Sequence, residues 1–146
     1  MWLAGGASNT GGAALLRFFT SEQMRAMEPG LDPAHPTGLE FWPLAARGER
    51  FPLADPAMES RHEPRPAEDV RFFQALLEGI GMVERRAYAR LTELGAPPLR
   101  SVRTVGGGAT NQGWTEIRKN LLGVPMLASA SEQASYGTAL LARRAL

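Results

Sequence analysis

The chain has 146 residues and a formal net charge of +1, from 16 basic and 15 acidic residues, and it contains no cysteine. This length predicts one domain that can bury a core, and the near-neutral charge argues against a nucleic-acid partner. The lack of cysteine excludes disulfides, thiolate metal sites and a cysteine nucleophile. No apolar run approaches a membrane span and no basic-then-apolar leader opens the chain, so we expect a soluble, cytoplasmic protein with no membrane partner.

The first twenty residues predict a short strand, a glycine-rich turn and a helix. Residues 2–4 are predicted to end the strand, and glycines follow at positions 5, 6, 11 and 12. Residues 13–19 place apolar side chains at helical spacing: Ala14, Leu15, Phe18 and Phe19. Thr20 and Gln23 have capping-box spacing, which predicts that another helical turn begins there.

Residues 28–66, which we call the proline-rich segment, contain eight of the 11 prolines and are predicted to be irregular. Their apolar residues nevertheless favour a loop that packs against the protein over a disordered linker. These residues are Leu39, Phe41, Trp42, Leu44, Phe51 and Leu53.

A long helix is predicted to begin at Pro66, with Glu68 and Asp69 near its positive end, and to stop at Gly95. Gly79 and Gly81 interrupt its apolar stripe, and each costs about 1 kcal/mol relative to alanine. They indicate either a bend or a group packed closely against the helix backbone.

The last fifty residues alternate between strand and helix. Residues 101–105 and 124–127 are predicted strands, and residues 110–122 are a predicted helix between them. Ser129 and Glu132 have capping-box spacing, which predicts a final helix through residue 145. This order predicts an α/β fold with short parallel strands, right-handed crossovers and helices packed on the strands.

Both glycine clusters, at 5–12 and 106–108, fall where a predicted strand turns into a predicted helix. Glycine lets a backbone approach a ligand, and the free N–H groups at a helix start favour an anion such as phosphate. Asn9, Asn111 and Gln112 could add hydrogen bonds to a base or ribose. Such turns can equally serve tight geometry alone, so the pattern leaves both interpretations open.

Other candidate sites are weaker. His35 and His62 have no second ligand at metal-binding spacing, so no metal site is expected. The three aspartates, Asp32, Asp55 and Asp69, fit turns and a helix start, and no catalytic triad is evident. Trp114 lies at helical spacing and is predicted to belong to the core.

The glycine motifs and the residues after them resemble a known family. Residues 106–118 (GGGATNQGWTEIR) with 122–125 (LGVP) resemble the nucleotide-binding signature of FGGY carbohydrate kinases, and residues 135–142 (SYGTALLA) resemble the helix that follows it. Residues 5–12 (GGASNTGG) and 47–52 (RGERFP) are similar to the D-ribulose or xylulose-kinase-like branch of plants and cyanobacteria.

The resemblance implies an actin-like enzyme with two ribonuclease-H-like domains and a cleft that holds ATP and a sugar. Residues 1–146 would be its C-terminal domain, incomplete because the N-terminal lobe and the first strands of this domain are not in the sequence. The nucleotide, ATP or ADP, would lie along Gly107, Gly108 and Ala109, with Asn111 or Gln112 near the adenine. Gly11 and Gly12 would lie near the phosphates or ribose.

The resemblance further implies a kinase that phosphorylates a pentulose, D-ribulose or D-xylulose, with Mg²⁺ held mainly by the nucleotide and the absent lobe. The family's catalytic aspartate precedes the start of this chain, so we assign no catalytic residue here and expect the chain alone to be inactive. The alternative is a non-enzymatic domain that binds nucleotide by itself or is a remnant. Uncovered strand edges predict self-association or an N-terminal partner lobe.

Overall fold

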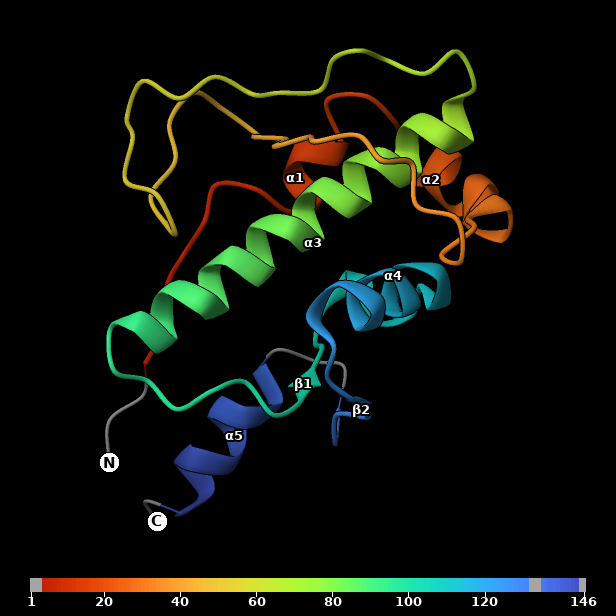
Figure 1. The fold of residues 1–146 in the computed structure, drawn as a ribbon. Helices are drawn as coiled ribbons and strands as arrows, with labels where there is room; N and C mark the ends of the chain where they lie inside the picture. The colour runs from red at the N-terminus through yellow and green to blue at the C-terminus, as the bar shows by residue number, and fades with distance from the viewer. Residues whose placement is uncertain (1–3, 132–134, 145–146) are drawn as a thin grey trace.

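The computed structural model describes residues 4–131 and 135–144, and its centre is one long helix, α3 (Asp69–Glu93) (Figure 1). The helix begins at Asp69 instead of the predicted Pro66, with the acidic Asp69 in its first turn. Every residue from 72 to 81 is buried, so this part of α3 is enclosed on all sides. The sequence predicted burial along one apolar stripe, so α3 is buried more completely than predicted.

The two glycines of α3 allow neighbouring segments to lie against its backbone. A Cβ added at Gly79 would be 2.8 Å from the backbone oxygen of Phe41, and one at Gly81 would be 2.6 Å from Cδ1 of Leu121. The helix runs on without a break through both positions. Close packing, the second of the two predicted alternatives, is therefore the reason for these glycines.

The N-terminal helices are short: α1 (Gly12–Leu15), α2 (Ser21–Met27) and the 3₁₀ turn η1 (Glu28–Gly30). The prediction of a helix over 13–19 was wrong beyond Leu15. A helix this short has little stability of its own, and Phe18 and Phe19 instead make edge-on ring contacts with Phe72 of α3. The capping box of α2 is confirmed.

The proline-rich segment packs against the protein, as predicted. Phe41, Trp42 and Leu44 are buried, whereas Leu53 is 52% exposed and does not join them. Two isolated antiparallel bridges, Trp42 with Arg61 and Glu49 with Asp55, bring distant parts of the segment together. The segment thereby covers one side of α3 without regular structure.

The C-terminal elements are β1 (Val102–Arg103), η2 (Gly107–Ala109), α4 (Gln112–Leu122), β2 (Met126–Leu127) and α5 (Ser135–Arg144). β1 and β2 pair in parallel, with Val102 opposite Met126, which confirms the α/β class. Both strands are shorter than predicted. Gly123 ends α4 in the left-handed conformation, with φ of 66°.

Two predicted features fall at the edges of the described residues. Of the predicted strand at 2–4, only Ala4 is described, and it is irregular. Glu132, the predicted capping partner of Ser129, lies outside the described residues. Residues 129–131 are not helical, so the last helix does not begin at Ser129 as predicted; α5 is described from Ser135, with its described side chains exposed.

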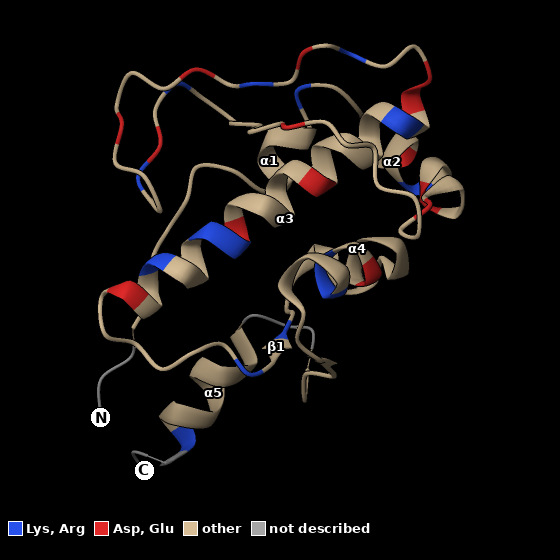
Figure 2. Cartoon of the chain, in the orientation of Figure 1, with Lys and Arg blue, Asp and Glu red and all other residues tan. Residues whose placement is uncertain are grey.

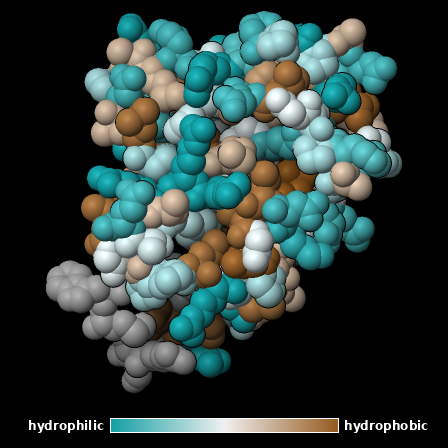
Figure 3. Space-filling view, viewed as in Figure 1, coloured by the Kyte–Doolittle hydropathy of each residue, from teal (hydrophilic) through white to brown (hydrophobic). Residues whose placement is uncertain are grey.

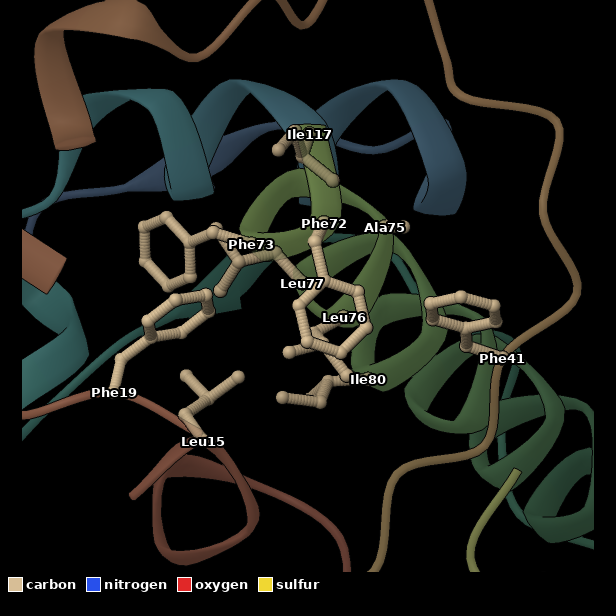
Figure 4. Packing of buried hydrophobic residues seen from close by; sticks show 10 residues of the cluster. All are labelled: Leu15, Phe19, Phe41, Phe72, Phe73, Ala75, Leu76, Leu77, Ile80 and Ile117. Atoms are coloured by element: carbon tan, nitrogen blue, oxygen red, sulfur yellow. The ribbon is translucent and has the colours of Figure 1, made fainter. Parts of the chain in front are cut away.

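The core gathers side chains from three segments around α3 (Figure 4). Leu15 and Phe19 approach from the N-terminal part, Phe41 from the proline-rich segment and Ile117 from α4. Full burial of one such side chain contributes about 1.5–3 kcal/mol. These contacts fix α1 and α4 on the same central helix, which matters for the site described next.

Acidic and basic residues alternate along the proline-rich segment and along α3 (Figure 2). Within the described residues, no helix has the length and apolar character to span a membrane.

Candidate functional site

The two glycine turns, far apart in the sequence, line one cavity. Gly11 and Gly12 of the first turn and Gly107 and Gly108 of the second all line it, and its volume is about 660 Å³. We call it the glycine cavity. Its size falls within the usual range of roughly 300–1,000 Å³ for small-molecule sites.

Buried or half-buried apolar side chains line the glycine cavity, and we call them its floor; the more exposed polar side chains that line it we call its rim. Leu15, Leu77, Ile80 and Trp114 are among the floor residues, and they come from α1, α3 and α4. Polar groups are contributed by Ser21, Arg25, Glu28 and Thr110. An apolar floor beneath glycine backbone suits a flat aromatic ring attached to polar groups.

The first turn is shaped by glycine more than by a helix start. Gly11, the residue before α1, has φ of 121°, a conformation that other residues rarely adopt. Because α1 has only four residues, its dipole is weak. The predicted helix N-terminus is therefore a single helical turn here. The backbone of Gly11 and Gly12, more than a helix dipole, is what this turn presents to the cavity.

The second turn is the 3₁₀ turn η2, which follows Gly106 with φ of 83°. Gly108 lies against the indole of Trp114: a Cβ added there would be 3.3 Å from Nε1. Ala109, predicted to lie along a nucleotide, is not among the residues that line the glycine cavity.

Asn111 lines the glycine cavity but serves α4 as its N-cap. Its Oδ1 accepts a hydrogen bond of 2.8 Å from the backbone N–H of Trp114, and the residue is 7% exposed. Gln112, the first residue of α4, is exposed and does not line the cavity. Of the seven predicted residues, the structure therefore brings five together and leaves out Ala109 and Gln112.

A buried ion pair fixes α4 and the second turn. Arg118 donates to Glu84 of α3 through Nε at 2.7 Å and Nη2 at 2.6 Å, and it also donates to Thr104 just after β1. This fork geometry is among the strongest side-chain contacts. The guanidinium also lies 5.3 Å from the centre of the Trp114 ring, against the cavity wall.

The first turn is held by a residue that motif reasoning did not select, Glu49. Its buried carboxylate accepts hydrogen bonds from Ser8 Oγ, the Asn9 N–H, Trp42 Nε1 and the Arg50 N–H. Burial alone would raise the pKa of the Glu49 carboxyl, but the four donors together outweigh it and keep the pKa below its ordinary value. The only signal in the sequence was its place in RGERFP.

Asn9 is committed to the same network. Its Nδ2 donates to the Gly48 carbonyl at 2.9 Å, and its Oδ1 accepts from Arg50 Nε at 2.7 Å. Its predicted contact with a base or ribose is therefore replaced by contacts within the protein.

A second cavity, of about 340 Å³, lies between the proline-rich segment, α3 and α4. Hydrophobic side chains gather between α3 and α4 on the face drawn in Figure 3. The buried carboxylate of Glu78, which lines this second cavity, already accepts hydrogen bonds from Thr37 and Gln74. One exposed glycine, Gly38 with φ of 73°, lines this second cavity, whereas a pair of glycines from each of two turns lines the glycine cavity.

No metal centre is formed within the part of the chain that the structure describes, since no three His, Asp or Glu side chains there are grouped for one. His35 Nδ1 lies 2.8 Å from Asp32 Oδ2 in an exposed turn. Asp32 and Asp55 each accept from a backbone N–H two residues on, which confirms their prediction as turn residues.

Comparison with known proteins gives a family match over almost the whole chain. The C-terminal domain of the FGGY family of carbohydrate kinases matches residues 3–146. The chain is also 23% identical, over 79 residues, to a rhamnulokinase of Bacteroides thetaiotaomicron. That alignment covers 54% of this chain and 16% of the rhamnulokinase, so the matched part is a small share of the relative's length.

Proposed function

We propose that this chain, which belongs to the FGGY family of carbohydrate kinases, supplies the ATP-binding side of an enzyme that transfers the γ-phosphoryl group of ATP to a sugar hydroxyl. The family's C-terminal domain is ribonuclease-H-like, and the α/β arrangement with a short parallel sheet agrees with it. The observation that carries the proposal is that both glycine turns line one cavity.

In this proposal the adenine lies on the apolar floor, against Ile80 and Trp114, and Gly107 and Gly108 lie along the nucleotide. Gly11 and Gly12, which line the same cavity, present backbone to the ribose or phosphates. Because the side-chain oxygen of Asn111 accepts the capping hydrogen bond from the Trp114 N–H, contacts to the adenine edge fall to Thr110, which lines the cavity.

ATP in this family acts with a divalent metal, which neutralises the developing charge on the transferred phosphoryl group. The described residues include no group of three that could hold a metal by themselves. We therefore assign Mg²⁺ to the phosphates of the nucleotide and to groups outside this chain. What the chain itself contributes is the backbone and apolar surface that orient the nucleotide.

The chain is proposed to be catalytically incomplete. Phosphoryl transfer depends on positioning from both sides of the reacting groups and on a base that accepts the hydroxyl proton. The acidic side chain that lines the glycine cavity is Glu28, at its rim, and no role as base is assigned to it. An ATP-coupled assay of the purified chain with D-ribulose, D-xylulose and rhamnulose is expected to give no turnover.

The sugar is proposed to be a pentulose, D-ribulose or D-xylulose. This rests on the likeness of residues 5–12 and 47–52 to that branch of the family. The similarity to a rhamnulokinase makes rhamnulose the competing choice. Turnover by the chain with any of the three would overturn the proposed incompleteness and identify the sugar at once.

Calorimetric titration with ADP tests the site directly. Since the chain is proposed to supply one side of a cleft, the Kd for ADP is expected in the millimolar range, a binding free energy of about −4 kcal/mol. Gly107→Leu should weaken it about tenfold or more, because the new side chain enters the cavity. A Cβ at Gly107 meets no atom within 4 Å, and its φ is not left-handed, so the change leaves the fold intact.

Gly5→Leu is the matched control. Gly5 also has open space around it and no left-handed φ, but it does not line the glycine cavity. It should leave ADP affinity within about twofold of the original. Absence of ADP binding at saturating concentration, or equal weakening by both variants, would refute the assignment of the site.

A further inference from the structure

Resting on that proposed function, we propose that Glu49 is a positioning residue of the nucleotide site. Its carboxylate holds the Gly11–Gly12 edge of the glycine cavity in place without itself lining the cavity. Glu49 belongs to the proline-rich segment, so the inference gives that segment a part in nucleotide binding.

The carboxylate is satisfied on both oxygens. Oε2 accepts from Ser8 Oγ at 2.7 Å and from Trp42 Nε1 at 2.9 Å, and Oε1 accepts from the N–H groups of Asn9 and Arg50, each at 2.8 Å. The residue is only 3% exposed. Four donors replace the water that the buried charge has lost, and they do so without a paired cation.

Two of these donors lie just before the first glycine turn. Ser8 and Asn9 are followed by Thr10, whose Oγ1 donates to the Pro43 carbonyl at 2.5 Å and whose N–H donates to Ser8 Oγ at 3.1 Å. The Asn9 carbonyl accepts from the Ala45 N–H at 3.3 Å. Residues 8–10 are therefore tied to the proline-rich segment by both main chain and side chains.

At the tip of the turn, the Gly11 carbonyl accepts a hydrogen bond of 2.9 Å from the Ala14 N–H of α1. A Cβ added at Gly11 or at Gly12 would meet no atom within 4 Å. Beyond the tip, α1 is anchored by the buried Ala14 and Leu15. The position of the exposed backbone edge is thus set by two anchors, the apolar one after the glycines and the Glu49 network before them.

A carboxylate suits this place because it only accepts hydrogen bonds. In Glu49→Gln, one oxygen becomes an NH2 group, which faces either Ser8 and Trp42 or the N–H groups of Asn9 and Arg50. In either orientation the NH2 group opposes at least one N–H donor, so the network cannot be satisfied as a whole. The volume of the side chain stays the same, so packing is preserved.

Calorimetric titration of the 146-residue chain with ADP tests the inference, together with thermal unfolding of each variant. Glu49→Gln is expected to raise the Kd for ADP about tenfold, the equivalent of one unsatisfied buried group. Ser8→Ala removes one donor and keeps the carboxylate, and it is expected to raise the Kd about threefold. Because Ser8→Ala is the milder change, it tests the inference even if Glu49→Gln fails to fold.

Glu78→Gln is the matched control. Glu78 is also a buried glutamate, 7% exposed, that binds the proline-rich segment, through the N–H and hydroxyl of Thr37. It has no contact with residues 8–12 and does not line the glycine cavity. Glu78→Gln should lower the melting temperature while leaving the Kd for ADP within about twofold.

The outcomes separate this inference from the function on which it rests. If the original chain does not bind ADP, the proposed function and this inference fall together. If it binds but folded Glu49→Gln and Ser8→Ala bind equally well, or if Glu78→Gln weakens binding as much as Glu49→Gln, only the positioning role of Glu49 is overturned. A double variant, Glu49→Gln with Ser8→Ala, should be no weaker than Glu49→Gln alone, because both act through one network.

Discussion

Three buried charged side chains, Glu49, Glu78 and Arg118, hold segments that lack regular structure: Glu78 and Arg118 join such segments to helices, and Glu49 joins residues 8–9 to the proline-rich segment. The first two accept hydrogen bonds within the proline-rich segment or from residues beside it, and Arg118 joins α4 to α3 and to Thr104. Removing one partner of such a contact leaves an unsatisfied buried group, which costs about 1–3 kcal/mol or more. At the scale of single residues, these polar contacts give the irregular segments a defined path.

The lowered pKa of Glu49 makes its contribution to stability depend on pH. Since the folded-state pKa lies below the ordinary value of 4.5, the contribution is fully present above about pH 4.5 and is lost as the pH falls through the folded-state pKa. The difference in melting temperature between the original chain and Glu49→Gln should therefore be largest at neutral pH and shrink as the pH is lowered below 4.5. Thermal unfolding followed by circular dichroism measures it, and a difference that is constant with pH would contradict the expectation.

At the scale of elements, α3 depends on two glycines to accept its neighbours. Gly79→Ala would place a Cβ 2.8 Å from the Phe41 oxygen and 2.9 Å from its Cβ. The gain in helix propensity of about 1 kcal/mol is therefore outweighed, and we expect a net loss of about 1–3 kcal/mol in the free energy of unfolding. Urea unfolding monitored by circular dichroism measures this loss.

Two other helix glycines serve as comparisons. Gly81→Ala should cost less than Gly79→Ala, because its neighbour is Cδ1 at the flexible end of Leu121. Gly137→Ala in α5 should not destabilise the chain, since a Cβ there meets nothing within 4 Å. A Gly79→Ala protein more stable than the original would contradict the packing explanation.

The sequence was sufficient to predict elements whose signals are local. Apolar spacing indicated α3 and α4, the Thr20–Gln23 pair indicated the start of α2, and branched residues indicated the strands that pair in parallel. It failed where packing overrides local preference. Phe18 and Phe19 leave the helical path because their rings pack on α3, and this depends on contacts more than fifty positions away.

The candidate site could also be predicted only where its signals are local in the sequence. Glycine clusters are visible in the sequence, and four of the cavity-lining glycines were selected from it. That Ala109 and Gln112 lie off the cavity follows from the direction in which η2 and α4 leave the turn, which no spacing encodes. Glu49 was missed as a site residue because its partners beside the first turn, Ser8 and Asn9, lie about forty positions away.

At the scale of the whole molecule, several large apolar side chains remain exposed. Leu94, Leu141 and Leu16 are 63%, 69% and 58% exposed, and Val105 and Leu127 beside the two-stranded sheet are exposed as well. Exposed apolar surface next to an open strand edge favours association. We expect the isolated chain to self-associate at micromolar concentration in sedimentation velocity, and Leu141→Lys to shift it toward monomer; a monodisperse monomer of the original chain would contradict this.

The buried glutamates also bear on how the chain folds. Ser8 and Glu49 are 41 positions apart, and so are Thr37 and Glu78. Contacts between residues so distant in the sequence slow folding compared with a bundle of locally paired helices. During synthesis on the ribosome, residues 32–37 lack their partners until Gln74 and Glu78 have emerged. The proline-rich segment is therefore completed late, after the helix that it will cover has been made.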